Sequence, residues 1–140
     1  MSDNYKLDKV GLTTIKQQLN TILDRITYIH HKDKEIIYVD YSGCKEAEMI
    51  YLTQQHRDLV LKENKTSLFL ANYENTYGTP DYMKAAKDFT QATNHLITKG
   101  AFLGVTGAKV YLLKGITFFF NVNFKTFTTK EEALEFLVSE

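Results

Sequence analysis

The sequence predicts an α/β fold: a mostly parallel four-stranded sheet with crossover helices, preceded by an extra N-terminal amphipathic helix. Short runs rich in β-branched and aromatic residues alternate with segments long enough for a helix. Strands spaced in this way pair in parallel through right-handed crossovers. The 140 residues include 44% hydrophobic residues and no linker or internal repeat, so we expect a single compact domain.

The N-terminal helix is predicted from apolar residues that recur at spacings of three and four between Leu12 and Ile29. This stripe either packs on its own domain or forms a homodimer seam through residues 12–29, although fewer than three heptads is short for a coiled coil. Residues 25–31 could instead be an edge strand that pairs with the next strand. We therefore divide the chain into a helical extension at 1–33 and an α/β domain at 34–140.

The middle of the chain alternates strands and helices. Strands are predicted at 35–41, 66–73 and 101–105, and helices at 45–63, 79–100 and 107–120. In the second of these helices Thr79 is the expected N-cap, Pro80 takes the first helical position and Gly100 is the expected stop.

The chain is predicted to end in a short strand and a helix. The strand is expected at 124–127, and the helix lies within 128–140. Thr129 and Glu132 have the spacing of a capping box, which satisfies the first backbone N–H groups of a helix.

The charge and cysteine content exclude several classes of function. Lys plus Arg and Asp plus Glu both number 17, so no global field attracts nucleic acid or an anionic membrane. We find no apolar run long enough for a bilayer and no signal-peptide core, and we expect a cytoplasmic protein. One cysteine and four scattered histidines indicate neither a disulfide nor a metal cluster, so no metal or cofactor is expected.

The candidate binding residues lie in the loops that follow the strands. In a parallel sheet these loops gather at the carboxyl edge, where ligands bind. The loops are 41–44, 72–79 and 106–109, and the candidate side chains are Tyr41, Ser42, Cys44, Asn72, Tyr73, Glu74, Thr79, Thr106 and Lys109.

Cys44 is a candidate nucleophile because a helix start lowers the pKa of a thiol. A cysteine phosphatase needs an arginine six residues later, where this chain has Ile50, and a thioredoxin-like site needs a second cysteine. We therefore favour a buried, structural Cys44 over a thiol-dependent enzyme.

Two other loop motifs point to structure rather than chemistry. Asp40 lacks the neighbouring acids of a magnesium-dependent phosphoacceptor site, and the next strand ends in Asn72, so Asp40 is expected to close a turn. The stretch GVTGAKV at 104–110 hints at an anion site, but Ala108 interrupts the phosphate-loop spacing. A tight turn is the favoured interpretation there.

The remaining candidates are histidines and aromatic residues. His56, on the apolar face of a helix, is expected to be half-buried and hydrogen-bonded, while His30 and His31 are expected in a solvated loop. The run Phe118–Phe120 is expected to pack against the sheet, with a lipid-like pocket wall or a partner surface as alternatives. We find no paired carboxylates, no Ser-His-Asp order and no metal spacing, so we do not expect an enzyme.

Four stretches together resemble a known family: IIYVDYSGC at 36–44, SLFLANYEN at 67–75, AFLGVTGAKVYLL at 101–113 and FKTFTTKEEALEFL at 124–137. This pattern is similar to that of the STAS-like proteins related to the anti-sigma-factor antagonist SpoIIAA, and to the Sec14-like fold. The resemblance covers about residues 34–138.

This resemblance implies a non-enzymatic regulatory or adaptor domain that binds an unidentified protein partner. In the antagonists, a serine at the start of the helix after a central strand is phosphorylated, within an Asp-Ser-Ser-Gly motif. The corresponding turn here is ENTYGTPDYM, in which Thr79 is the only hydroxyl at the helix start and no Asp precedes it. Thr79 is therefore the candidate phosphorylation site.

The Sec14 resemblance implies an alternative, a carrier of a small apolar molecule or lipid. Its pocket would be lined by the aromatic-rich segment from Ile116 to Phe127. An enlarged apolar cavity between sheet and helices would favour the carrier, whereas a solid core with exposed apolar loops would favour the adaptor.

Overall fold

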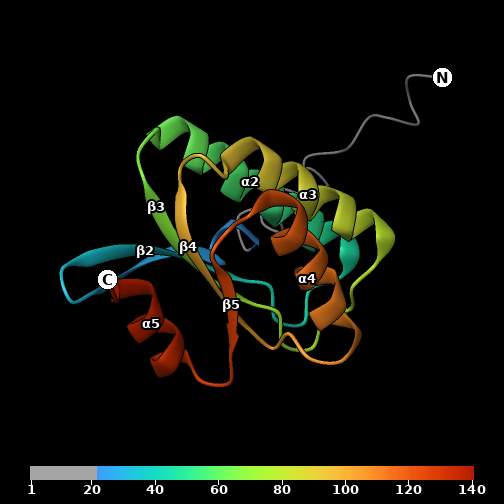
Figure 1. The fold of residues 1–140 in the computed structure, drawn as a ribbon. Coiled ribbons are helices and arrows are strands. Elements are labelled where there is room, and N and C mark those ends of the chain that lie inside the picture. Colours follow the sequence, from blue (N-terminus) through green and yellow to red (C-terminus); the bar gives the residue numbers. More distant parts are fainter. Residues whose placement is uncertain (1–21) are drawn as a thin grey trace, which may run out of the picture.

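The computed structural model describes residues 22–140 and centres on a five-stranded sheet in the order β1-β2-β3-β4-β5 (Figure 1). The strands are β1 (Ile26–His31), β2 (Lys34–Asp40), β3 (Ser67–Asn72), β4 (Ile97–Leu103) and β5 (Phe124–Phe127). The helices are α2 (Glu46–Glu63), α3 (Pro80–Thr93), α4 (Ala108–Phe120) and α5 (Lys130–Val138). The strands β2 to β5 are parallel, as predicted.

The fifth strand corrects the prediction of four. β1 pairs antiparallel with β2, from Ile26 opposite Val39 to the end of the hairpin. The turn residues Lys32 and Asp33 have φ of 48° and 65°, a left-handed backbone whose twist suits a two-residue hairpin. The helical prediction is thus wrong for residues 26–31, and the edge-strand alternative is confirmed.

β1 changes how the N-terminal region is described. Residues 26–31 are part of the sheet, although the sequence-based division places them in the extension. His30 and His31, expected in a loop, lie in this strand. Residues 12–21, the larger part of the predicted helix and dimer seam, lie outside the described residues.

The second correction concerns the end of α3, which stops at Thr93 rather than near Gly100. The hydroxyls of Thr90 and Thr93 donate to the carbonyls of Ala86 and Phe89, at 2.8 and 2.7 Å. Such bonds from threonine to the preceding turn weaken a helix. The next β-branched residues enter β4, so Gly100 lies in a strand.

The predicted helix starts are confirmed. The hydroxyl of Thr79 accepts a hydrogen bond from the backbone N–H of Tyr82 at 3.1 Å, and Pro80 is the first helical residue. Thr129 accepts from the N–H of Glu132 at 3.2 Å and donates to its side chain at 2.9 Å. These caps satisfy N–H groups that have no partner within the helix.

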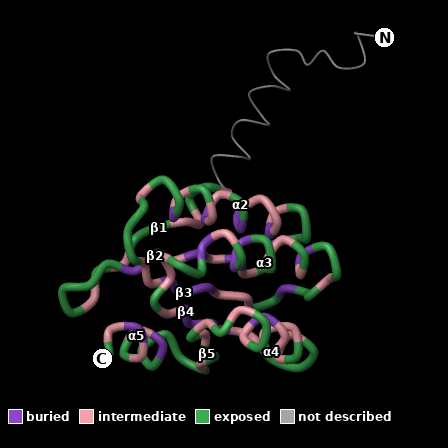
Figure 2. Tube along the Cα trace, turned by 45° about the horizontal axis from the view of Figure 1, so that its top comes forward, coloured by how far each residue is buried: buried purple, intermediate pink, exposed green. Residues whose placement is uncertain are grey.

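Helices cover both faces of the sheet (Figures 1 and 2). α5 packs on one face, where Leu137 and Ala133 join Leu70 in a buried cluster. α2 and α3 cover the other face, and Phe69 and Ala71 contribute to the larger cluster there. Alternate residues of β3 therefore belong to the two halves of the core, as expected for a central strand. No helix of residues 22–140 is long and apolar enough to cross a membrane.

We predict that Gly100→Ala destabilises the fold by about 1–3 kcal/mol, because overpacking a filled core forces neighbours to move. A Cβ at Gly100 would lie 2.6 Å from the Phe69 ring and 2.9 Å from the Phe124 ring. The matched control is Gly115→Ala on α4, where a Cβ would meet no atom within 4 Å. That change should stabilise by about 0.5–1 kcal/mol through helix propensity. Urea denaturation measures both, and equal effects would contradict the packing of Gly100.

Candidate functional site

The loops at the carboxyl edge of the sheet come together. The backbone N–H of Gly43 donates to the carbonyl of Glu74 at 3.0 Å, and that of Tyr73 donates to Leu103 at 2.8 Å. The Lys109 ammonium donates to the Tyr73 carbonyl at 3.1 Å. The edge predicted from the strand order is therefore formed by direct contacts between the three loops.

Two of these loops are closed by the same turn. A side-chain oxygen of Asp40 accepts from the N–H of Ser42 at 3.0 Å, and that of Asn72 accepts from the N–H of Glu74 at 3.0 Å. Short polar side chains close turns in this way. The prediction that Asp40 closes a turn is confirmed.

Cys44 is a core residue. Its side chain is buried in the larger cluster, and α2 begins only at Glu46. Burial raises the pKa of the thiol, with a smaller opposing effect from the Arg25 guanidinium. A raised pKa leaves less reactive thiolate, so the structural interpretation of Cys44 holds.

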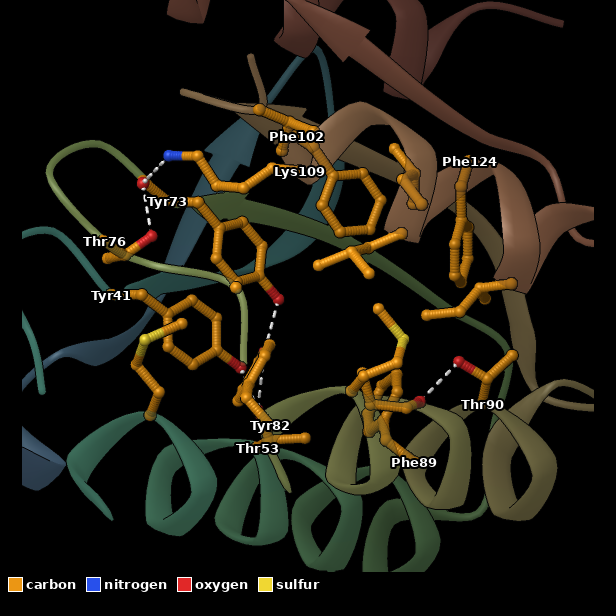
Figure 3. Close-up of a pocket in the computed structure, with 18 of the residues that line it drawn as sticks. Tyr41, Thr53, Tyr73, Thr76, Tyr82, Phe89, Thr90, Phe102, Lys109 and Phe124 are labelled. Atoms are coloured by element: carbon orange, nitrogen blue, oxygen red, sulfur yellow. Dashed lines mark hydrogen bonds between the residues drawn. The ribbon is translucent and has the colours of Figure 1, made fainter. Parts of the chain in front are cut away.

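An apolar cavity of about 70 Å³ lies beneath the loops, between the sheet and α2, α3 and α4 (Figure 3). Its walls are mostly aromatic and aliphatic, and the phenylalanines are Phe69, Phe89, Phe102 and Phe124. On the loop side the lining includes the half-buried Lys109 and Leu112 and the exposed Tyr77 and Gly78.

Four hydroxyls form a hydrogen-bonded chain on the loop side of the cavity (Figure 3). Tyr41 pairs with Thr53 at 2.8 Å, Thr53 with Tyr82 at 3.0 Å, and Tyr82 with Tyr73 at 2.6 Å. The rings of Tyr41 and Tyr73 stack with centroids 4.6 Å apart. Burial raises the pKa of all three tyrosines well above the ordinary value, so they are neutral donors and acceptors.

His56 is a further polar residue of the cavity wall. The residue is 2% exposed, and its ring lies 5.0 Å from that of Phe69 and 4.5 Å from that of Phe89. Burial lowers its pKa from 6.5 to about 3, so the imidazole is neutral. Its Nε2 has no hydrogen-bond partner among the described residues. His56 is thus fully buried rather than half-buried, and its Nε2 lacks the expected hydrogen bond.

Four aromatic side chains lie on the outside of the domain. Tyr77 of the β3–α3 loop and Phe118 of α4 are each 84% exposed, and Tyr111 and Phe119 of α4 are also exposed. The expectation that Phe118 and Phe119 pack against the sheet is wrong, because the inner side of α4 is formed by other residues, of which Ile116 is buried.

The nine predicted binding residues fall into distinct environments. Those that line the cavity are Tyr41, Tyr73 and Lys109. Cys44 is buried, Ser42, Asn72 and Thr79 are half-buried, and Glu74 and Thr106 are exposed. The cavity also uses residues of α2 and of the first turn of α3 that were not predicted as binding residues, namely Thr53, His56 and Tyr82. The only indication of them in the sequence was their position on apolar helix faces.

Among residues 22–140, no group of three or more His, Cys, Asp or Glu residues is placed to hold a metal ion.

Comparison with solved structures gives the fold. A protein of the DUF3478 family from Shewanella loihica, described as having a SpoIIAA-like fold, superposes on this chain with a TM-score of 0.62. The two sequences are 14% identical, and the match covers 80% of this chain and 91% of the Shewanella protein. This chain has a SpoIIAA-like fold. An anti-sigma-factor antagonist (STAS) domain protein from Planctomyces limnophilus superposes with a TM-score of 0.56 at 16% identity over 81% of this chain and 98% of that one. Neither a family model nor a curated protein sequence matches the chain. The STAS-like resemblance seen in the sequence is thus confirmed for the fold.

We predict that His56 makes the stability of this SpoIIAA-like fold depend on pH. Between the unfolded pKa of 6.5 and the folded pKa of about 3, the unfolded chain binds a proton that the folded one does not. Stability should therefore be fully present above pH 6.5 and fall as the pH drops, by up to about 1.4 kcal/mol per pH unit. Denaturation at pH 7 and pH 5 should show a loss that His56→Leu lacks.

The control for this measurement is His95→Leu, which removes an exposed histidine. It should keep the pH dependence of the unchanged protein. If His56→Leu keeps it as well, the buried neutral imidazole is contradicted.

Proposed function

We propose that this protein is a non-enzymatic, cytoplasmic regulatory or adaptor domain that binds a protein partner. The binding surface begins at the carboxyl-edge loop that carries Tyr77 and continues along α4. The observation that carries this proposal is the exposure of the four aromatic side chains Tyr77, Tyr111, Phe118 and Phe119, which are 73–84% exposed. Exposed apolar patches mark interaction sites, and aromatic residues are enriched in interfaces. We name these four residues the aromatic surface.

The charge beside the aromatic surface indicates the chemistry of the partner. An open groove of about 580 Å³ lies between the start of α3 and Leu112 of α4. Its charged lining residues are Lys84 and Lys87, and it contains no carboxylate. The Lys87 ammonium lies 6.0 Å from the centroid of Phe119. An apolar peptide segment that carries Asp or Glu residues would complement this surface.

The fold supports the same class of function. One protein with this fold is described as an anti-sigma-factor antagonist (STAS) domain protein. Antagonists of that kind act by contact with another protein, so a partner-binding role suits a chain with this architecture.

We predict that Phe118→Ser with Phe119→Ser weakens partner capture by at least tenfold, because aromatic residues supply much of the energy of protein interfaces. The measurement is affinity capture from host lysate with the unchanged protein and the variant, followed by a titration of the partner that is found. Leu61→Ser is the matched control, since Leu61 is 41% exposed on α2. Equal titration curves for all three proteins would rule out the aromatic surface as the binding site.

We further propose that phosphorylation of Thr79 switches partner binding. Thr79 lines the groove together with Lys84 and Lys87 and caps the 14-residue helix α3. A phosphate there would gain from the helix dipole and the lysines, but it would replace the capping hydroxyl and lie near Asp81. Modification would therefore change the charge of the groove.

Incubation with host-lysate kinases should add one phosphate at Thr79, as read by mass spectrometry of tryptic peptides. Thr129 is the matched control, because it is also an N-cap threonine but caps α5 away from the groove. Thr79→Val should remove the modification. A Thr79 peptide that stays unmodified under all conditions would contradict the switch.

A second candidate function, a small-molecule carrier, is favoured by the apolar cavity. Within the segment from Ile116 to Phe127, only Ile116 and Phe124 line it, and the other walls come from the sheet, α2, α3, the first half of α4 and the loops. The pocket therefore differs from the aromatic-rich wall expected from the sequence. Binding of a small apolar probe in solution would support this candidate, and failure of such probes to bind would count against it.

A further inference from the structure

We propose that the cavity binds a small uncharged molecule that has an apolar ring or branched chain and one hydroxyl group, with the hydroxyl paired to Nε2 of His56. The inference rests on the second candidate function, the carrier, and specifies the chemistry of its ligand. It concerns the cavity rather than the aromatic surface, although Tyr77 belongs to that surface and also lines the cavity.

The first argument is the unfilled hydrogen bond of His56. The imidazole is 2% exposed and lines the cavity, and its Nε2 meets no donor or acceptor among the described residues. Buried polar atoms nearly always have a partner, and leaving one without costs free energy. A neutral imidazole offers one donor and one acceptor nitrogen, and a hydroxyl can serve either. A ligand hydroxyl therefore suits Nε2 in both tautomers.

The second argument is that the hydroxyl chain satisfies itself. Tyr41, Thr53, Tyr82 and Tyr73 carry one hydroxyl hydrogen each, and three hydrogen bonds join them. The side chains of Tyr41 and Tyr73 also shift each other's pKa through hydrogen bonding. The chain therefore needs no external acceptor, and Nε2 of His56 is the buried side-chain atom that lacks a partner among the described residues.

The third argument is the small number of charged groups in the lining. Of the described residues, no Asp, Glu or Arg lines the cavity, and its charged side chain, Lys109, donates to the Tyr73 carbonyl at 3.1 Å. An amine inside such a site loses its hydration without gaining a counter-ion. A carboxylate could pair only with the Lys109 ammonium, which already has a partner, so an uncharged ligand is favoured. The phenylalanine rings around His56 favour an apolar body next to the hydroxyl.

The volume limits the size of the ligand. The cavity of about 70 Å³ is roughly half the ~150 Å³ of a protein cavity that admits benzene. A single ring therefore needs a small displacement of the lining, which the flexible side chains of Met49 and Met83 can provide. These two methionines line the cavity and also report on its occupation.

The experiment compares phenol with benzene, which differ only by the hydroxyl. Each is titrated into the full chain labelled with ¹³C at the methionine methyl groups, and the shifts of Met49 and Met83 are followed. We expect phenol to bind about tenfold more tightly than benzene, the size expected for one net hydrogen bond. In His56→Leu, which keeps a similar volume, the ratio should fall to about twofold or less while benzene still binds. Ile116→Trp, which fills the cavity from α4, should abolish the shifts with both probes.

The outcomes separate the inference from the function on which it rests. Equal affinity for phenol and benzene in the unchanged protein would overturn the inference but leave an apolar carrier. An unchanged preference in His56→Leu would also overturn it, because the hydroxyl would then pair elsewhere. Failure of both probes to bind would remove the carrier function together with the inference. The comparison of phenol with benzene needs no variant, so a folding defect in His56→Leu cannot conceal the result.

Discussion

The rest of the structure depends on the packing of aromatic rings around Phe69 at the centre of the sheet. The ring of Phe69 extends from β3 and lies within 5.0–5.8 Å, centroid to centroid, of the rings of His56, Phe89, Phe102 and Phe124. These neighbours come from α2, α3, β4 and β5, so one side chain joins four elements. The ring also covers the space where a side chain at position 100 would be, so a residue larger than glycine at that point of β4 would force its neighbours to move. The position of the helices over the sheet follows from this aromatic packing.

The hydroxyl chain is the polar counterpart of this cluster. It joins α2 and α3 to the segments that follow β2 and β3 at the carboxyl edge of the sheet. Because the hydroxyls are buried, their hydrogen bonds are made in a medium of low dielectric constant and are costly to break. The same groups line the cavity, so the part of the core that fixes the loops is also the part that can contact a ligand. His56 differs from them because its Nε2 makes no such bond within the described chain.

Local patterns in the sequence predict the features that depend on neighbours along the chain. Thr79 with Pro80 and Thr129 with Glu132 mark helix starts because a cap needs only the first turn. The strand–helix alternation likewise predicts that the three loops meet at one edge. The helix predicted from the apolar residues between Leu12 and Ile29 is wrong beyond residue 25. Spacings of three and four among β-branched residues do not reveal that a segment has a hairpin partner. The prediction of Gly100 as a helix stop is wrong for a similar reason. The rings that favour glycine at this strand position come from β3 and β5, which are distant in the sequence. Long-range packing also decides which face of α4 is buried and whether His56 finds a partner, and no local pattern contains that information.

The cavity and the groove are separated by a thin wall. Gly78, Met83 and Leu112 line both, and a side chain at position 78 would collide with Leu112. A ligand that moves Met83 or Leu112 to enter the cavity must also change the shape of the groove. By thermodynamic linkage, a partner that binds one form of the groove more tightly would then change the affinity of the cavity by the same factor. The adaptor and carrier functions therefore do not compete as explanations of this fold, because the same side chains would couple a ligand inside the domain to a partner outside it.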